Sequence, residues 1–328
     1  MEKELILVTG GAGYIGSQTC KLLHQKGFIP VTFDNLSTGH PENVQWGPLE
    51  IGDIREKGDL GRLFDKYKFK SVFHFAAKAY VGESVSDPLS YFSTNISGSI
   101  NLIEEFLYRG GENFIFSSSC ATYGEPIVDF ISENQEQKPI NPYGFTKLAI
   151  EKLVIALAKN GEFNFAILRY FNAAGADLNC EIGEWHDPET HVIPLLIQSL
   201  RNKQPFTIFG SDYETLDGTA VRDYIHVVDL ADAHWAALQE ISENSRNLIV
   251  NVGTGIGISI KELVDMVSEL DPDFRVLFEE RRSGDPAKLV ADISLIEKEL
   301  KWKPRHSTGR KILETAINWH DLKNLTDK

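Results

Sequence analysis

The chain has 328 residues, of which 42% are hydrophobic and 24% charged, values typical of a soluble globular protein with a large core. Its formal net charge of −14 argues against nucleic acid or an anionic membrane as a partner, and a phosphorylated ligand would need locally placed cations. Cys20, Cys120 and Cys180 lie far apart without metal-binding spacing, which predicts reduced thiols in a cytoplasmic protein and no metal site.

The first strand-like run begins at Glu4, so no secretory leader is expected, and no apolar run reaches the roughly 20 residues of a membrane span. Residues 5–8 are predicted to be a buried strand, 13–26 a helix that ends at Gly27, and 29–33 the next strand, which together make a right-handed βαβ unit. Residues 71–75, 113–117 and 165–170 are further strand candidates, separated by helix-length segments. This alternation predicts an α/β fold with a doubly wound parallel sheet, a Rossmann fold.

After about residue 172 the strands become shorter and the loops longer. Loops are predicted at 173–188 and 211–218, strands at 206–209, 221–227 and 248–252, and helices at 193–201, 228–238 and 259–270. We therefore expect a dinucleotide-binding domain over 1–172 and a smaller mixed α/β lobe over 173–328. Some later segments, such as 221–253, are candidates for packing back onto the first domain.

A glycine-rich turn, Thr9-Gly-Gly-Ala-Gly-Tyr-Ile-Gly16, links the first predicted strand to the first helix. In that context Gly10 permits a tight turn, Gly13 lets the backbone approach a pyrophosphate, and Gly16 allows the helix to pack closely on the strand. The free N–H groups of the helix N-terminus favour phosphate. The turn predicts a dinucleotide site, and an ordinary strand-to-helix connection is the alternative.

Acidic and small residues end the neighbouring strands. Asp34 ends the second strand, where a carboxylate accepts hydrogen bonds from the adenosine ribose and repels a 2′-phosphate, so NAD is predicted rather than NADP. A strand-end turn residue is the alternative for Asp34. Asp53 and Ile54 follow a third strand and could flank the adenine. Phe75-Ala76-Ala77 ends the fourth strand at the carboxyl edge, where such sheets bind ligands.

Tyr143 and Lys147 are four residues apart, which places them on one face of a helix. An ammonium group beside a phenol lowers the phenol pKa, so Tyr143 is predicted to act as a general base. Ser117-Ser-Ser119 ends another strand at the same sheet edge and could hydrogen-bond a reacting oxygen, with strand-end capping as the alternative. Asn141-Pro142 is expected to begin the helix.

These motifs together resemble the extended short-chain dehydrogenase/reductase family. The resemblance rests on the glycine turn, Asp34-Asn-Leu36, Gly52-Asp-Ile54, the serine run and Tyr143-x-x-x-Lys147. Val81-Gly-Glu-Ser84, Arg169-Tyr-Phe-Asn172 and Val221-Arg-Asp-Tyr-Ile-His226 narrow it to the UDP-hexose 4-epimerases of that family. The similarity extends over nearly the whole chain, from residue 5 to residue 302.

The resemblance implies an isomerase that retains its NAD and interconverts UDP-glucose and UDP-galactose. Tyr143 would take the proton of the sugar 4-hydroxyl while C4 gives hydride to the cofactor, and after the 4-keto sugar turns over, hydride returns to its other face. The implied cofactor contacts are Gly10, Gly13, Tyr14, Ile15, Gly16, Asp34, Asn35, Asp53, Ile54, Phe75, Ala76, Ala77, Asn95, Ser117, Tyr143, Lys147 and Tyr170.

The resemblance also implies a set of substrate contacts, namely Ser119, Tyr143, Asn172, His191, Phe209, Arg222, Arg282, Asp285 and Leu289. Within this set Ser119 would hydrogen-bond the 4-oxygen, Arg222 and Arg282 would bind the diphosphate, and Asp285 the uridine ribose. Phe209 would lie along the uracil. The two arginines would supply the local positive charge that a diphosphate requires in an acidic chain, since each guanidinium group donates two hydrogen bonds to phosphate oxygens.

Three positions depart from the family pattern. Lys78 lies one residue away from a lysine that contacts the NAD phosphates in many members, so that role is not assigned to it. His191 stands where many members have an asparagine near the diphosphate, and a purely structural histidine is the alternative. Leu289 lies near a position where tyrosine excludes N-acetylated sugars. Because leucine is smaller, we hypothesise that UDP-N-acetylglucosamine is also accepted.

Several other functions compete with this one. A 4,6-dehydratase has Asp-Glu after the catalytic serine, whereas this chain has Cys120-Ala121-Thr122, which argues against dehydration. A uronic acid decarboxylase belongs to the same group of rivals. A UDP-glucuronate 4-epimerase differs in only a few pocket residues and stays open. A non-catalytic NAD-sensing regulator is the alternative from another class, although such a protein could lose the tyrosine and lysine that are present here.

The resemblance also implies a homodimer. Two long helices, predicted over residues 90–108 and 143–160, would form a four-helix interface between two copies. An ordinary buried face is the alternative.

Overall fold

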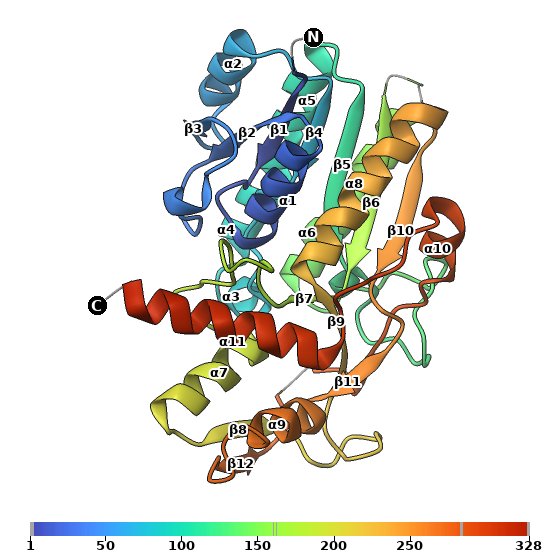
Figure 1. Ribbon diagram of the computed structural model, residues 1–328. Coiled ribbons are helices and arrows are strands. Elements are labelled where there is room, and N and C mark those ends of the chain that lie inside the picture. The colour runs from blue at the N-terminus through green and yellow to red at the C-terminus, as the bar shows by residue number, and fades with distance from the viewer. Residues whose placement is uncertain (1–2, 160, 162, 283–284, 327–328) are drawn as a thin grey trace.

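The structure is a computed structural model that describes residues 3–159, 161, 163–282 and 285–326 (Figure 1). Its larger sheet has seven parallel strands in the order β10-β6-β5-β4-β1-β2-β3. These strands are β1 (Leu5–Thr9), β2 (Ile29–Asp34), β3 (Leu49–Ile51), β4 (Ser71–His74), β5 (Asn113–Ser119), β6 (Asn164–Tyr170) and β10 (Leu248–Val252). The predicted doubly wound Rossmann sheet is confirmed.

Helices cover both faces of this sheet, and we call the sheet with its covering helices the first lobe. On one face lie α2 (Lys57–Lys66), α5 (Ser99–Tyr108) and α6 (Pro142–Ala158), whose apolar residues form one core cluster with the strands. On the other face lie α1 (Tyr14–Gln25), α8 (Val227–Asn244) and α10 (Ser294–Leu300) with Trp302. Because both faces are buried, the strands are continuously apolar rather than alternating.

The helix predicted over residues 90–108 is divided in the structure. It consists of α4 (Pro88–Tyr91), a π-helix η2 (Phe92–Gly98) and α5. Such wide turns occur mostly at functional sites, and this one holds Asn95, which is predicted to lie near the cofactor. The second long helix, α6, begins at Pro142 with the Asn141 side chain accepting from Gly144 N, as predicted, whereas Asn160 lies outside the described residues.

The second lobe is smaller and mixed (Figure 1). Its main sheet is centred on β9 (Val221–His226), which pairs with β7 (Asn172–Ala174), β11 (Gly257–Ser259) and β13 (Lys288–Leu289). A separate pair joins β8 (Phe206–Phe209) to β12 (Val276–Glu279). Helices α7 (Val192–Asn202), α9 (Ile260–Ser268) and α11 (Gly309–Thr326) pack against these strands around a third core cluster.

Short elements complete the chain. They are η1 (Pro41–Asn43), α3 (Val81–Ser86) and η3 (Cys120–Tyr123). Among the described residues no helix has both the length and the apolar composition required to cross a membrane.

The chain passes between the lobes more than once. After β9 it returns to the first lobe as α8, which packs against α1, and as β10, which becomes the edge strand beside β6 (Figure 1). Ser259 then begins α9 with a capping box that also involves Glu262. The boundary predicted at residue 172 stays a prediction, but the first lobe as observed includes α8 and β10.

A buried ion pair joins α6 to the neighbouring strands β5 and β6. The Arg169 guanidinium donates from Nη2 to Glu151 Oε2 at 2.7 Å and from Nη1 to Tyr123 Oη at 2.9 Å. Ser118 Oγ donates to Glu151 Oε1 at 2.5 Å. The side chains of Arg169 and Glu151 are 4% and 0% exposed, so each charge depends on the other for compensation.

We expect Glu151→Gln to destabilise the fold strongly, because it leaves the Arg169 charge buried without its carboxylate. Removing one partner of such a pair lowers the free energy of unfolding by about 3–5 kcal/mol. Urea denaturation followed by circular dichroism measures the change. The matched control is Glu112→Gln, which breaks the exposed pair with Lys70 and should leave the midpoint almost unchanged. Equal midpoint shifts in the two variants would contradict the expectation.

Candidate active site

The glycine turn between β1 and α1 forms a cradle that side chains would fill. Gly10 has φ +73°, and a Cβ there would lie 2.6 Å from Ala76 N. A Cβ on Gly16 would lie 2.2 Å from Gly10 O, and Gly13 is the N-cap residue of α1. The turn therefore needs glycine for its conformation and its close contacts, and it leaves the amide end of α1 open to a phosphate.

Asp34, at the end of β2, closes the turn from the opposite side. Its Oδ2 accepts from Ala12 N at 3.0 Å and its Oδ1 from Leu36 N at 2.9 Å. Burial raises the pKa of Asp34, and these two N–H donors oppose that rise. A carboxylate accepts about four hydrogen bonds, so Asp34 keeps capacity for ribose hydroxyls. This arrangement fits the predicted preference for NAD.

The predicted adenine-side residues divide between surface and core. Asp53 Oδ2 accepts from Asn35 Nδ2 at 2.8 Å, and hydrogen bonds from Arg55 lower the pKa of Asp53 to about 2. The Ile54 side chain is 4% exposed and lies in the core cluster with α5. Asp53 and Asn35 thus lie together beside the end of β2, whereas the Ile54 side chain packs inward.

The first residues of α1 connect the turn to the rest of the protein. Tyr14 Oη donates to Gly175 O at 2.6 Å, directly after β7, and Ile15 packs against the core cluster that contains β1. Two turns further along α1, buried Lys21 donates to Asp177 Oδ1 at 2.7 Å. These contacts hold the loop after β7 close to the glycine turn.

The end of β4 lies against the same turn. The N–H groups of Phe75 and Ala76 both donate to Thr9 O at 3.0 Å, and the Phe75 ring packs into the core near His234. Asn95 in η2 exchanges hydrogen bonds with the Lys78 backbone, at 2.8 Å and 2.9 Å, just after the Ala77 position. Asn95 Nδ2 also donates to Thr146 Oγ1 at 3.0 Å, so this residue links the end of β4 to α6.

Tyr143, Lys147 and Ser119 converge at the carboxyl end of β5. Lys147 Nζ donates to Ser117 O at 2.7 Å and lies 5.9 Å from the centroid of the Tyr143 ring. Ser119 Oγ accepts from Ala121 N at 3.1 Å, and the Ser119 side chain is among the groups that lower the pKa of the Tyr143 hydroxyl. Ser117 Oγ donates to Tyr170 Oη at 2.8 Å on the neighbouring strand β6. The structure brings these predicted residues together.

Burial dominates the electrostatics of this group. It raises the pKa of Tyr143 well above its usual range, with the Ser119 hydrogen bond opposing the rise, and it lowers the pKa of Lys147 to about 7. The predicted depression of the phenol pKa by Lys147 stays a prediction, because desolvation is the largest influence on Tyr143 here. A positive charge beside the ring would favour the phenolate.

The predicted diphosphate and uridine residues gather on the second lobe. Arg222 on β9 donates from Nη2 to Asp285 Oδ1, and the Arg282 guanidinium lies over the Phe209 ring, 4.1 Å from its centroid. Asn172 is on the adjacent strand β7, in register with Tyr224. Two guanidinium groups, an acid and an aromatic face are thus assembled in one region, which suits a nucleoside diphosphate.

Leu289 on β13 lies between the two groups of site residues. It is in register with Arg222 on β9 and packs against a small cluster that contains Cys120 and Phe171. Cys120 follows Ser119 directly. Burial raises the pKa of Cys120 to about 12, and the charge of Arg222 opposes that rise, which places the arginine near the catalytic strand end.

His191 contacts an acidic side chain that is not among the predicted site residues. It is the N-cap residue of α7, and its Nδ1 contacts Glu184 Oε1.

The Glu151–Arg169 pair is a feature of the site that was not predicted from the sequence. Glu151 follows Lys147 by four residues on the same helix, and this spacing could have revealed it.

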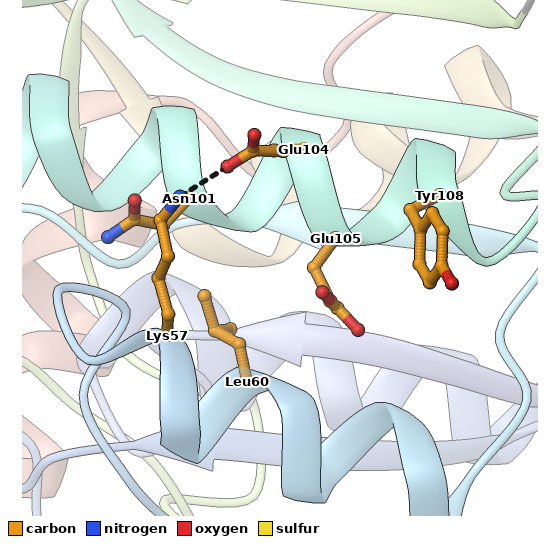
Figure 2. A pocket seen from close by; sticks show the side chains of 6 residues that line it. All are labelled: Lys57, Leu60, Asn101, Glu104, Glu105 and Tyr108. Atoms are coloured by element: carbon orange, nitrogen blue, oxygen red, sulfur yellow. Dashed lines mark hydrogen bonds and ion pairs between the residues drawn. The ribbon is translucent and has the colours of Figure 1, made fainter.

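A further groove lies away from these residues. Figure 2 shows it between α2 and α5, where the Lys57 ammonium donates to Glu104 Oε2 at 2.6 Å. Its lining is Lys57, Leu60, Asn101, Glu104, Glu105 and Tyr108. None of the predicted cofactor or substrate residues lines this groove, so the site is assigned from convergent chemistry rather than from the hollow of Figure 2.

Comparisons with known proteins bear on the fold, the cofactor and the reaction. Residues 6–253 match the sequence model of the NAD dependent epimerase/dehydratase family. The chain is 46% identical to the UDP-glucose 4-epimerase of Rhizobium meliloti, over 99% of each chain. It is similar to the crystal structure of UDP-glucose 4-epimerase from Brucella ovis in complex with NAD, with TM-score 0.92 and 46% identity over 96% of this chain and 98% of that one.

A second similar structure is the UDP-Glc/GlcNAc 4-epimerase of Campylobacter jejuni. Its TM-score is 0.85 and its identity 38%, over 97% of this chain and 99% of that one.

We expect Gly10→Ala to abolish stable NAD retention. A side chain at φ +73° costs about 1–3 kcal/mol of backbone strain, and its Cβ would also clash with the Ala76 backbone. The measurement is the NAD content of the purified variant, with its thermal midpoint. The control is Gly61→Ala within α2, where a Cβ meets nothing within 4 Å and should slightly stabilise the helix. Wild-type NAD content in Gly10→Ala would contradict the assignment of the turn.

Proposed function

The chain belongs to the NAD dependent epimerase/dehydratase family, and from this we propose that it interconverts UDP-glucose and UDP-galactose by inverting C4 of the hexose. The resemblance to UDP-hexose 4-epimerases is confirmed, as are an isomerase activity and NAD as the cofactor. The observation that carries the proposal is the convergence of Tyr143, Ser119 and Lys147 at the end of β5, beside the arginines of the second lobe.

In the proposed reaction the Tyr143 oxygen takes the proton of the sugar 4-hydroxyl, and C4 loses hydride. Ser119 hydrogen-bonds the 4-oxygen and holds it against the phenol. NAD, when bound, supplies the hydride acceptor and donor, and its oxidised ring adds the positive charge that the buried phenol needs to ionise. Tyr143 later returns the proton to the 4-oxygen of the sugar whose C4 has been inverted. The cycle therefore consumes neither cofactor nor solvent protons.

The cofactor would be held by the residues of the glycine turn, by Asp34 with Asn35 and Asp53, and by Lys147 at the nicotinamide ribose. The cradle at Gly10 and Gly16 and the open amide end of α1 support this assignment. Arg222 and Arg282 would bind the diphosphate, with Asp285 on the uridine ribose, Phe209 along the uracil and Asn172 on the sugar side. Their shared position on β7, β9 and the neighbouring segments supports this assignment.

One assay tests the proposed reaction. Tag-free protein is incubated with UDP-galactose, UDP-N-acetylgalactosamine or UDP-galacturonate without added NAD, and the epimers are separated by chromatography. Conversion of UDP-galactose is expected, because the retained cofactor is regenerated in every cycle. Conversion of UDP-galacturonate alone would instead favour a uronic acid epimerase, and no conversion of any sugar with NAD bound would favour a non-catalytic regulator.

We expect Tyr143→Phe to lower the turnover number by about 10²–10⁴-fold while NAD stays bound, because the variant loses the group that moves the proton. Product formation and NAD content are measured on the same preparation. Tyr108→Phe is the matched control, since its ring is 80% exposed on α5, and its turnover should equal that of the wild type. Activity in Tyr143→Phe within a few-fold of wild type would rule out this mechanism.

We propose that UDP-N-acetylglucosamine is a second substrate, because Leu289 packs beside Cys120 and Phe171 and is smaller than a tyrosine. Leu289→Tyr is expected to lower kcat/KM for this sugar at least about tenfold, or about 1.4 kcal/mol, while UDP-glucose turnover persists. Leu289→Met, which conserves volume, is the control. If wild-type enzyme leaves UDP-N-acetylglucosamine untouched, the second substrate is excluded.

We also propose a homodimer formed through η2, α5 and α6. Large apolar side chains that are 41–82% exposed in one chain gather here, namely Leu89 on the adjoining α4, Phe92 on η2, Ile100 on α5 and Phe145 on α6. Such a surface suits a second copy that presents the same patch.

Three free cysteines, two of them buried, support the cytoplasmic location that we infer for this enzyme.

Sedimentation velocity tests the dimer. Ile100→Glu places a charge in the proposed interface and should shift the enzyme from dimer to monomer at micromolar concentration. Leu216→Glu, at a fully exposed loop position, is the control and should not change the sedimentation coefficient. Wild-type protein that sediments as a monomer would exclude this interface.

A further inference from the structure

Four side chains with metal-binding atoms converge on the loop between β7 and α7. They are Glu184, His186, Glu189 and His191, and their ligand atoms all lie within 4.8 Å of one another. The proposed epimerisation uses none of the first three. The sequence argument predicted no metal, because it considered cysteine spacing and treated His191 alone.

The distances suit a small tetrahedral ion. His186 Nδ1 lies 3.7 Å from Glu184 Oε1 and 3.4 Å from Glu189 Oε2. A tetrahedron with Zn–N and Zn–O bonds of about 2.0–2.1 Å has edges of about 3.3–3.4 Å. His191 Nδ1 and Glu184 Oε1 are in direct contact, so an ion between them requires this pair to separate to a similar edge.

Hydrogen bonds and ring packing from neighbouring residues hold these four side chains in place. Glu189 Oε1 accepts from the N–H groups of Thr190 and His191, at 2.7 Å and 2.8 Å, which orients the carboxylate towards His186. Tyr80 packs edge-on against the His186 ring, with centroids 5.5 Å apart. Ligand residues held in this way lose little freedom on binding an ion.

The charge and the burial of these four side chains also favour a bound cation. The side chains of Glu184, Glu189 and His186 are 5%, 6% and 16% exposed, so two carboxylates are almost removed from water. Their ion-pair partners are the two imidazoles. With neutral imidazoles the cluster carries two negative charges, which one divalent cation balances. His191, half exposed, leaves a path by which an ion can enter.

We propose that Glu184, His186, Glu189 and His191 bind one Zn²⁺ ion in a structural site. Two imidazoles with two carboxylates are ligands that Zn²⁺ accepts, whereas Mg²⁺ and Ca²⁺ prefer oxygen alone. Four protein ligands close the tetrahedron, so no position is left for a reacting water. Because His191 begins α7, the ion joins the loop after β7 to that helix.

The test measures metal binding directly, without UDP-sugar, so its outcome is separate from that of the epimerase assay. Protein without a histidine tag is stripped with a chelator, reloaded with ZnCl₂, passed through a desalting column and analysed by mass spectrometry for zinc. One equivalent is expected. CoCl₂ in place of zinc should give the intense visible absorption of tetrahedral cobalt.

Variants decide whether these residues are the ligands. His186→Asn and Glu189→Gln should each weaken Zn²⁺ at least about tenfold in a competition titration with a chromophoric chelator, and circular dichroism shows whether they fold. His24→Asn, an exposed histidine at the end of α1, is the control and should bind zinc as the wild type does.

Two results would overturn the proposal. The first is desalted wild-type protein with far less than one zinc per chain, which would leave protonated imidazoles as the partners of the carboxylates. The second is equal zinc affinity in the folded variants His186→Asn and His24→Asn.

Discussion

The buried ion pair between Glu151 and Arg169 is the interaction on which the catalytic geometry depends. It connects α6, which carries Tyr143 and Lys147, to β6, while the Ser118 hydroxyl connects the same carboxylate to β5. Ser119 follows immediately on β5. The phenol, the ammonium and the serine hydroxyl are therefore positioned by one charged network beneath them, in which every charge is compensated by another buried group.

Much of the fold was predictable because local pattern and topology agree in the first lobe. Buried parallel strands are continuous apolar runs, and the glycine turn marks where β1 ends and α1 begins. The same argument placed Ser119 and Phe75 at one sheet edge, since parallel strands end on the same side. The residues of the second lobe were identified by resemblance alone, because Arg222 on a short strand and Arg282 on a loop look like ordinary surface cations in the sequence.

What the sequence did not reveal depends on contacts between distant segments. The π-helix at Phe92–Gly98 has no signature in its residues, yet it is where Asn95 reaches both the end of β4 and α6. The effect of Lys147 on Tyr143 stays a prediction, because spacing on a helix says nothing about how completely both groups lose water. The cluster around His186 was missed because its spacing matches no familiar metal motif.

The return of the chain to the first lobe as α8 and β10 has a consequence for how the protein is made. A ribosome that has released residues 1–172 has supplied six of the seven strands of the larger sheet, but β10 and the α8 cover of β5 and β6 are still missing. Because domains fold as units once their sequence is complete, this sheet can be completed only after Val252 has left the ribosome. By then most of the second lobe has also been made. The glycine turn thus belongs to a lobe that is completed late in synthesis, after the strands that carry Asn172 and Arg222 have been made.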